Sequence, residues 1–188
     1  ILKQVAKNNI FGIDKDREAI YVAIFSLYLA MLDYLEPAEI ANFQFPNLLE
    51  SNFFSCDFFD EEASFNSSLK SIEFDFILGN PPWKSGGMTS LTDTYIKKRG
   101  KQEKKKQIKK HPIGINNKEI AECFVLRVSD FSSPQTQIAL IVKSCVLYNS
   151  YKGAGSPFRR YWLDEFFVNK VIELAAVRKE VFERSNDP

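Results

Sequence analysis

The stretch FDFILGNPPWKSGG, residues 74–87, shows a short apolar run that stops abruptly on a proline-rich turn. The run from Phe76 to Leu78 is typical of a buried strand, and Gly79 begins the turn that follows. A turn needs glycine, asparagine or proline, but it rarely needs two prolines in a row and then a tryptophan. The composition of this turn therefore indicates a role beyond reversing the chain.

Strands and helices alternate on both sides of this stretch. Apolar runs predict strands over residues 9–14, 48–54, 73–78, 136–147 and 171–174, and helical spacing predicts helices over residues 17–35, 118–130 and 156–167. Asp16 suits the N-cap of the first of these helices, and Pro157 suits the first turn of the last. Near-continuous apolar strands between helices are typical of a parallel sheet covered on both faces. The sequence therefore predicts an α/β fold with a partial doubly wound, mainly parallel sheet.

Composition limits the class of protein. The 188 residues, 45% of them hydrophobic, suffice for a single domain over residues 1–188 with its own core. The most apolar stretch, residues 19–32, is shorter than the roughly 20 residues that a membrane span needs. We therefore expect a buried helix there and no membrane partner. The few, scattered cysteines make a reducing cytoplasm the expected compartment.

Cysteine and histidine are too few for a zinc site or a disulfide framework. The chain has three scattered cysteines and one histidine, which we assign to packing or to the surface: Cys56, Cys123, Cys145 and His111. We expect no metal.

One segment, residues 85–117, is too long and polar for an ordinary connection, and we expect it to form a basic loop. Lysines and one arginine crowd its centre between Lys97 and Lys110, against the single acid Glu103. Because the net charge of the whole chain is only +1, any nucleic-acid footprint has to be local. The basic run is either a solvated loop or a segment that follows DNA phosphates.

Two acids follow predicted strands, where ligands bind in open parallel sheets. Asp14 either accepts hydrogen bonds from ribose hydroxyls or shapes the strand-to-helix turn, the role that we assign to Asp16. Asp57 either accepts from an adenine amino group, with the ring of Phe58 packed on the base, or is a surface acid in a polar loop.

The turn after residues 73–78 suits chemistry on an aromatic amine. The lone pair of such a nitrogen is delocalised into the ring, so two acceptors that take both N–H bonds would localise it. Asn80 offers its side-chain oxygen and Pro81 its carbonyl, while Pro81 and Pro82 fix φ and remove competing donors. Trp83 offers a flat face on which an extruded base can stack. The alternative is a tight strand exit with its tryptophan in the core; the flanking strand and polar loop favour the site.

These motifs, over residues 8–180, resemble the catalytic region of amino-group methyltransferases that use S-adenosylmethionine, above all the N6-adenine DNA methylases of restriction–modification systems. The family signature matches Asn80 to Trp83, its ribose-binding acid falls on Asp14, and its cofactor-adenine acid falls on Asp57. Trp83 and the closing segment, residues 160–182, are more similar to large combined restriction–modification enzymes than to protein-glutamine methylases.

The resemblance implies a class I methyltransferase fold, which is Rossmann-like, with S-adenosylmethionine as cofactor and DNA as partner. It also implies parts of a parent chain beyond this one: a glycine-rich first loop before Ile1 and a target-recognition domain. We therefore expect residues 1–188 by themselves to be inactive. The alternatives are a methylase of a protein glutamine or an RNA base, and a non-catalytic DNA-binding fragment.

Overall fold

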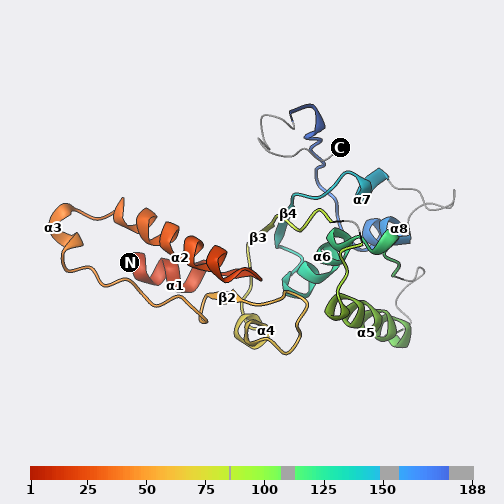
Figure 1. Cartoon of the computed structure of the whole chain (residues 1–188), viewed down its shortest axis with the longest axis horizontal. Coiled ribbons are helices and arrows are strands. Elements are labelled where there is room, and N and C mark those ends of the chain that lie inside the picture. The colour runs from red at the N-terminus through yellow and green to blue at the C-terminus, as the bar shows by residue number, and fades with distance from the viewer. Residues whose placement is uncertain (85, 107–112, 149–156, 178–188) are drawn as a thin grey trace. The chain divides into compact units, whose positions relative to one another are not determined.

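The computed structural model describes residues 1–84, 86–106, 113–148 and 157–177 (Figure 1). Two compact units divide the chain: unit 1 comprises Ile1–Asp75 with Asp130–Thr136, and unit 2 comprises Phe76–Ser129 with Gln137–Pro188. His111, the last lysines of the basic run and the end of the closing segment lie outside the described residues. No helix in the described ranges is both long and apolar enough to cross a membrane.

Unit 1 begins with a helix that the sequence analysis did not predict. Its elements are α1 (Leu2–Asn9), β1 (Gly12–Asp14), α2 (Arg17–Leu32), α3 (Pro37–Ile40), β2 (Phe53–Ser55) and α4 (Ser64–Leu69). The buried Asn52 side chain donates from Nδ2 to the carbonyl oxygens of Lys7 (2.8 Å) and Ile10 (2.9 Å), so it satisfies the end of α1. Asp16 caps α2 as predicted, because its carboxylate accepts from the Glu18 N–H at 2.9 Å.

The parallel pair β1–β2 is covered on both faces, as the sequence predicts for an α/β layer. Successive residues of a strand point to opposite faces. Phe53 packs on one side in a core with Ala6 of α1 and Ile24 of α2, whereas Phe54 packs on the other side with Phe65 of α4.

Unit 2 contains the second parallel pair. Its elements are β3 (Phe76–Gly79), α5 (Ser90–Lys106), α6 (Ile120–Val128), β4 (Gln137–Leu140), α7 (Cys145–Tyr148) and α8 (Pro157–Glu165). In β3–β4, Phe76 lies opposite Gln137 and Gly79 opposite Leu140. A Cβ at Gly79 would come within 2.9 Å of Leu140 Cδ2, so a larger residue before the proline-rich turn would require the Leu140 side chain to shift.

The predicted α/β class and the parallel pairing are confirmed, whereas one doubly wound sheet is not evident. The described strands pair only in parallel, but they form two separate two-stranded sheets within a mixed α/β chain. Unlike β1–β2, the pair β3–β4 leaves one face open: Phe76 is 68% exposed and Leu78 is 75% exposed. An apolar strand pattern predicts burial and pairing direction, but it does not specify how many strands gather into one sheet or what covers them.

Other element boundaries differ from the prediction. The apolar run over residues 136–147 is a strand only as far as Leu140 and ends in α7, and residues 171–174 form no strand. The predicted basic loop, residues 85–117, contains the 17-residue helix α5.

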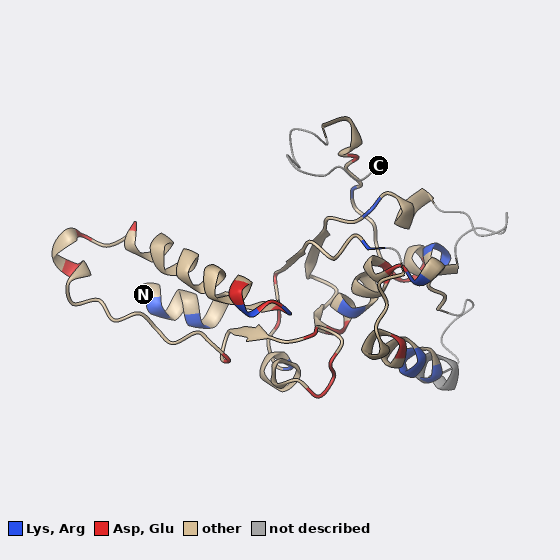
Figure 2. Ribbon diagram, in the orientation of Figure 1, with Lys and Arg blue, Asp and Glu red and all other residues tan. Residues whose placement is uncertain are grey.

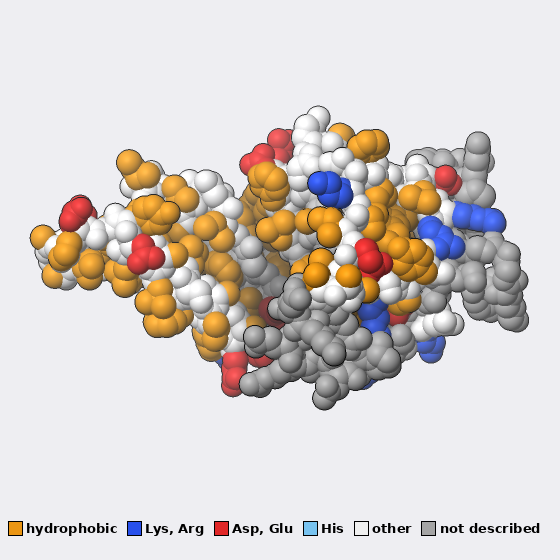
Figure 3. Space-filling view, turned by 90° about the horizontal axis from the view of Figure 1, so that it is seen from above, with side chains coloured by type: hydrophobic (Ala, Val, Ile, Leu, Met, Phe, Trp, Pro, Cys, Tyr) orange, Lys and Arg blue, Asp and Glu red, His pale blue; other side chains and the backbone are white. Residues whose placement is uncertain are grey.

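Hydrophobic side chains also reach the surface of unit 1. Helix α2 buries Ile20 and Ile24 but exposes Val22 (63%) and Phe25 (60%), so apolar residues lie on both its buried and its exposed sides. Figure 3 shows hydrophobic side chains, in orange, on the surface that faces the viewer. A surface helix normally keeps one polar face.

Candidate functional site

The proline-rich turn lies at the carboxyl end of β3, beside the end of β4. The Ile141 N–H donates to the Gly79 carbonyl at 3.0 Å, which extends the β3–β4 ladder to the first residue of the turn. The indole Nε1–H of Trp83 donates to the Ile141 carbonyl at 3.2 Å. Trp83 is half-buried, so its ring is held against the strand end and keeps part of its surface open to solvent.

The two residues that the sequence analysis assigned as acceptors in this turn differ in exposure. Asn80 is exposed, whereas Pro81 is buried and anchors the turn. Within the described part of the chain, no hydrogen bond occupies the Asn80 side chain or the Pro81 carbonyl. The turn therefore combines an anchored tryptophan with two acceptors that have no competing internal donor.

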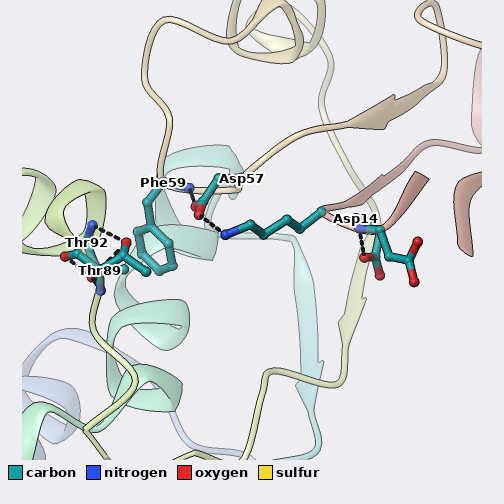
Figure 4. A network of polar contacts seen from close by, with 7 residues as sticks. Asp14, Asp57, Phe59, Thr89 and Thr92 are labelled. Carbon is teal, nitrogen blue, oxygen red and sulfur yellow. Dashed lines mark hydrogen bonds and ion pairs between the residues drawn. The ribbon is translucent and has the colours of Figure 1, made fainter. Parts of the chain in front are cut away.

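The two predicted cofactor acids follow neighbouring strands of unit 1. Asp14 ends β1, and the Cys56 N–H donates to its carbonyl at 2.9 Å, which places the segment after β2 beside it. Asp14 Oδ1 accepts from the Asp16 N–H at 2.7 Å (Figure 4). Asp14 therefore does form the strand-to-helix turn, and its side chain is exposed, with Oδ2 outside that bond.

Asp57 is engaged on both carboxylate oxygens. Oδ1 accepts from the Phe59 N–H at 3.0 Å, and Oδ2 lies 3.5 Å from Lys15 Nζ (Figure 4). Its side chain is only 18% exposed, which differs from the surface acid that was the alternative interpretation. Lys15 was missed by the sequence analysis, because nothing in the pattern FGIDKD shows that its side chain reaches across to the next strand end.

Phe58 packs in the core of unit 1. Its ring lies 6.0 Å from that of Phe65 and 5.8 Å from that of Phe131, close to parallel with each. Phe58 is half-buried, so packing accounts for part of its surface, and its contact with a base stays a prediction.

The predicted site residues fall into two groups, one in each unit. Asp14, Asp57 and Phe58 belong to unit 1, and the turn from Asn80 to Trp83 belongs to unit 2.

Helix α5 follows the turn and carries the basic run. Thr89 and Thr92 cap its start reciprocally: the Thr89 N–H donates to Thr92 Oγ1 at 2.6 Å, and the Thr92 N–H donates to Thr89 Oγ1 at 3.3 Å (Figure 4). Thr92 and Tyr95 are buried, whereas Lys97, Lys98 and Lys101 are exposed. Figure 2 shows Lys and Arg positions, in blue, along this helix.

Arg99 differs from its lysine neighbours because it holds α5 on α6. Its guanidinium donates to the Leu126 carbonyl and to Ser129 Oγ, both at 2.9 Å, and to the Tyr95 hydroxyl at 2.7 Å. The basic run therefore divides into one arginine that stabilises unit 2 and a lysine face turned to solvent.

A buried acid lies under the start of α6. Glu122 is fully buried and accepts from the Asn116 N–H (2.8 Å) and from Asn116 Nδ2 (2.7 Å). Burial raises the pKa of Glu122 to about 7, the nearby Glu119 adds to the rise, and the Asn116 hydrogen bonds and Arg159 oppose it. Next to this pair, Asn117 and Lys118 adopt positive φ values of 45° and 55°. The carboxylate thus holds a strained turn in place.

The sequence analysis assigned the cysteines to packing or to the surface. Cys123 is buried in the core, whereas Cys56 and Cys145 are half-buried. No cluster of three or more metal-binding side chains occurs among the residues that the structure describes.

Comparison with known proteins assigns the family. The family model of the Eco57I restriction-modification methylases matches residues 8–182. No curated protein and no solved structure gives a significant match. Since the match covers most of the chain, the protein belongs to this family of restriction–modification methylases, whose activity is DNA methylation.

Proposed function

We propose that the protein transfers a methyl group from S-adenosylmethionine to the N6 amino group of an adenine flipped out of DNA, as part of a restriction–modification system. The observation that carries the proposal is the turn after β3: the Asn80 amide and the Pro81 carbonyl have no competing donor in the described chain, and Trp83 is anchored to Ile141 beside them. Two acceptors beside a flat ring suit an aromatic amine that must be held by both N–H bonds while the base stacks.

The chain's own residues would act on the acceptor nitrogen. Asn80 and Pro81 take its two N–H bonds, draw it toward tetrahedral geometry and stabilise the positive charge that develops on it. Trp83 fixes the plane of the base, so the lone pair points in one direction. When bound, S-adenosylmethionine would supply the electrophilic methyl group: the N–C bond would form as the S–C bond breaks, with S-adenosylhomocysteine as the leaving group. The methylated nitrogen would then lose one N–H proton to water, and no covalent bond between enzyme and substrate is needed.

Asp14 and Asp57 fit the nucleoside part of that cofactor. Asp14 Oδ2 lies outside the local turn and is an acceptor for ribose hydroxyls, while Asp57 is a partly buried acceptor for an adenine amine. Phe58 beside Asp57 would contact the base with the part of its ring that the core leaves uncovered.

The lysine face of α5 is the proposed contact with DNA. Lys97, Lys98 and Lys101 are exposed, and α5 begins seven residues after Trp83 in the sequence. Such cations neutralise phosphates without reading sequence. A solvated helix with no partner is the alternative, and the salt dependence described in the Discussion separates the two.

The doubly wound class I fold is part of the same proposal. In the doubly wound strand order, strands 3 and 2 are neighbours and strands 4 and 5 are neighbours, which agrees with the pairs β2–β1 and β3–β4.

The direct test is Asn80→Ala in the full-length protein. Because Asn80 would act on the transition state, we expect methylation to fall by about 100-fold or more at saturating cofactor while DNA affinity stays within about two-fold. Turnover close to that of the wild type would refute the assignment. The assay offers adenine in duplex DNA, adenine in RNA and a glutamine peptide side by side, so that transfer to either of the last two would favour an alternative substrate.

A further inference from the structure

Asp57, to which we assign the adenine amine of the cofactor, forms an ion pair with Lys15. Lys15 Nζ lies 3.5 Å from Asp57 Oδ2, and Asp57 Oδ1 already accepts from the Phe59 N–H at 3.0 Å (Figure 4). Oδ2 therefore accepts no backbone hydrogen bond and is the oxygen with more capacity left for a ligand amine, and it faces the lysine.

The arrangement follows from the β1–β2 pairing. Asp14 lies opposite Ser55 in the register, so the residues that follow the two strands, Lys15 and Asp57, come close together. The Lys15 backbone continues the turn that Asp14 begins, and the Lys15 side chain is 75% exposed. The long side chain can swing into water and leave Oδ2 open, because nothing buries its stem.

We propose that Lys15 is a placeholder for the adenine amine: it pairs with Asp57 while the nucleoside site is empty and is displaced when the amine binds. The inference rests on the proposed function. An ammonium and a neutral aromatic amine compete for the same oxygen, so part of the binding free energy of the cofactor is spent on separating the pair. The pair is exposed on the lysine side and therefore weak, so the competition lowers cofactor affinity by a factor of about two to five.

Lys15 would also stabilise the nucleoside site before the cofactor binds. Asp57 is only 18% exposed, and a partly buried carboxylate with no cation near it is costly. Lys15 keeps this charge compensated until the amine replaces it, so the site can be built before the ligand arrives.

The test is calorimetric binding of S-adenosylhomocysteine to the full-length protein and to Lys15→Met, which keeps a long apolar side chain. We expect the variant to bind about two- to five-fold more tightly at low salt, and the difference to shrink as salt screens the wild-type pair. The analogue of the same ligand with unsubstituted purine in place of adenine has no amine that can donate to Asp57, so the variant should not bind it more tightly than the wild type does.

Two controls locate the effect. Lys70→Met removes an exposed lysine elsewhere in unit 1 and should leave affinity unchanged. In an Asp57→Asn background, Lys15→Met should no longer tighten binding, because the pair is already lost.

Equal affinity of Lys15→Met and wild type, or weaker binding by the variant, would overturn the inference. A tightening that persists in the Asp57→Asn background would overturn it too. If the wild type binds no S-adenosylhomocysteine at all, the proposed function itself fails, so the two failures are distinguishable.

Discussion

Replacing the buried Glu122 by glutamine should remove a pH dependence from the stability of unit 2. The pKa of Glu122 is raised from its ordinary 4.5 to about 7, first by burial and then by Glu119, so the folded state holds a proton more tightly than the unfolded chain. The contribution of protonated Glu122 to the free energy of unfolding is therefore fully present below about pH 4.5 and is lost as the pH rises to about 7.

The size of the effect follows from the shift. At 1.36 kcal/mol per pKa unit, a rise from 4.5 to about 7 amounts to about 3 kcal/mol of free energy of unfolding. Glutamine stays neutral at every pH and can keep two hydrogen bonds, because the Asn116 amide can turn to accept from the new NH₂ group. Relative to wild type, the variant should therefore gain about 3 kcal/mol between pH 4 and pH 8.

Urea unfolding at several pH values is the assay. The sequence contains two tryptophans, Trp83 and Trp162, and both lie in unit 2, so indole fluorescence follows this unit. Glu165→Gln on α8 is the matched control, since that side chain is exposed. A difference between Glu122→Gln and wild type that stays constant from pH 4 to pH 8 would show that burial does not perturb this carboxyl.

The remaining predictions concern the site. Asp14→Ala should weaken S-adenosylmethionine binding by about 1.5–3 kcal/mol, since ribose hydroxyls would lose a charged acceptor; unchanged affinity in calorimetry would leave Asp14 with its turn-forming role alone. Trp83→Phe keeps a ring but loses the bond to the Ile141 carbonyl, so methylation should fall by about five-fold in steady-state assays. Replacing Lys97 and Lys101 by glutamine should weaken binding to cognate and unrelated duplexes equally and make the slope of log affinity against log salt shallower by up to about 1.8; superimposable salt lines would mean that these lysines only solvate the helix.

Local signals predicted three of the described helices, α2, α6 and α8, and missed the others. Asp16 as N-cap and Pro157 at the first helical position gave the starts of α2 and α8, because both act within one turn. The run after residue 136 was extended too far, since an apolar run does not distinguish strand from helix and here it continues into α7. Helix α5 was missed because its lysines suggested a loop, although lysine is a good helix former and Thr89 with Thr92 provides a cap.

Features of the site that lie within one segment of the sequence were predictable, whereas contacts between two distant segments were not. Asn80 to Trp83 are consecutive, so the motif and the strand before it sufficed. The bond from Trp83 to the Ile141 carbonyl and the pair of Lys15 with Asp57 each join two strand ends, and only the β-pairing brings those together. Arg99 shows the same limit, because the sequence groups it with the lysines while its contacts with α6 separate it from them.

Because Cys123 is buried in α6, its reaction with a thiol reagent would report the local unfolding of unit 2. Its thiol is fully buried, and burial raises its pKa to about 12, so a thiol reagent meets neither an accessible sulfur nor a thiolate while the helix is in place. Alkylation of Cys123 should therefore proceed at the rate at which α6 leaves the core. A duplex or nucleotide that binds folded unit 2 would slow this labelling, so ligand binding could be followed by mass spectrometry without any measurement of methyl transfer.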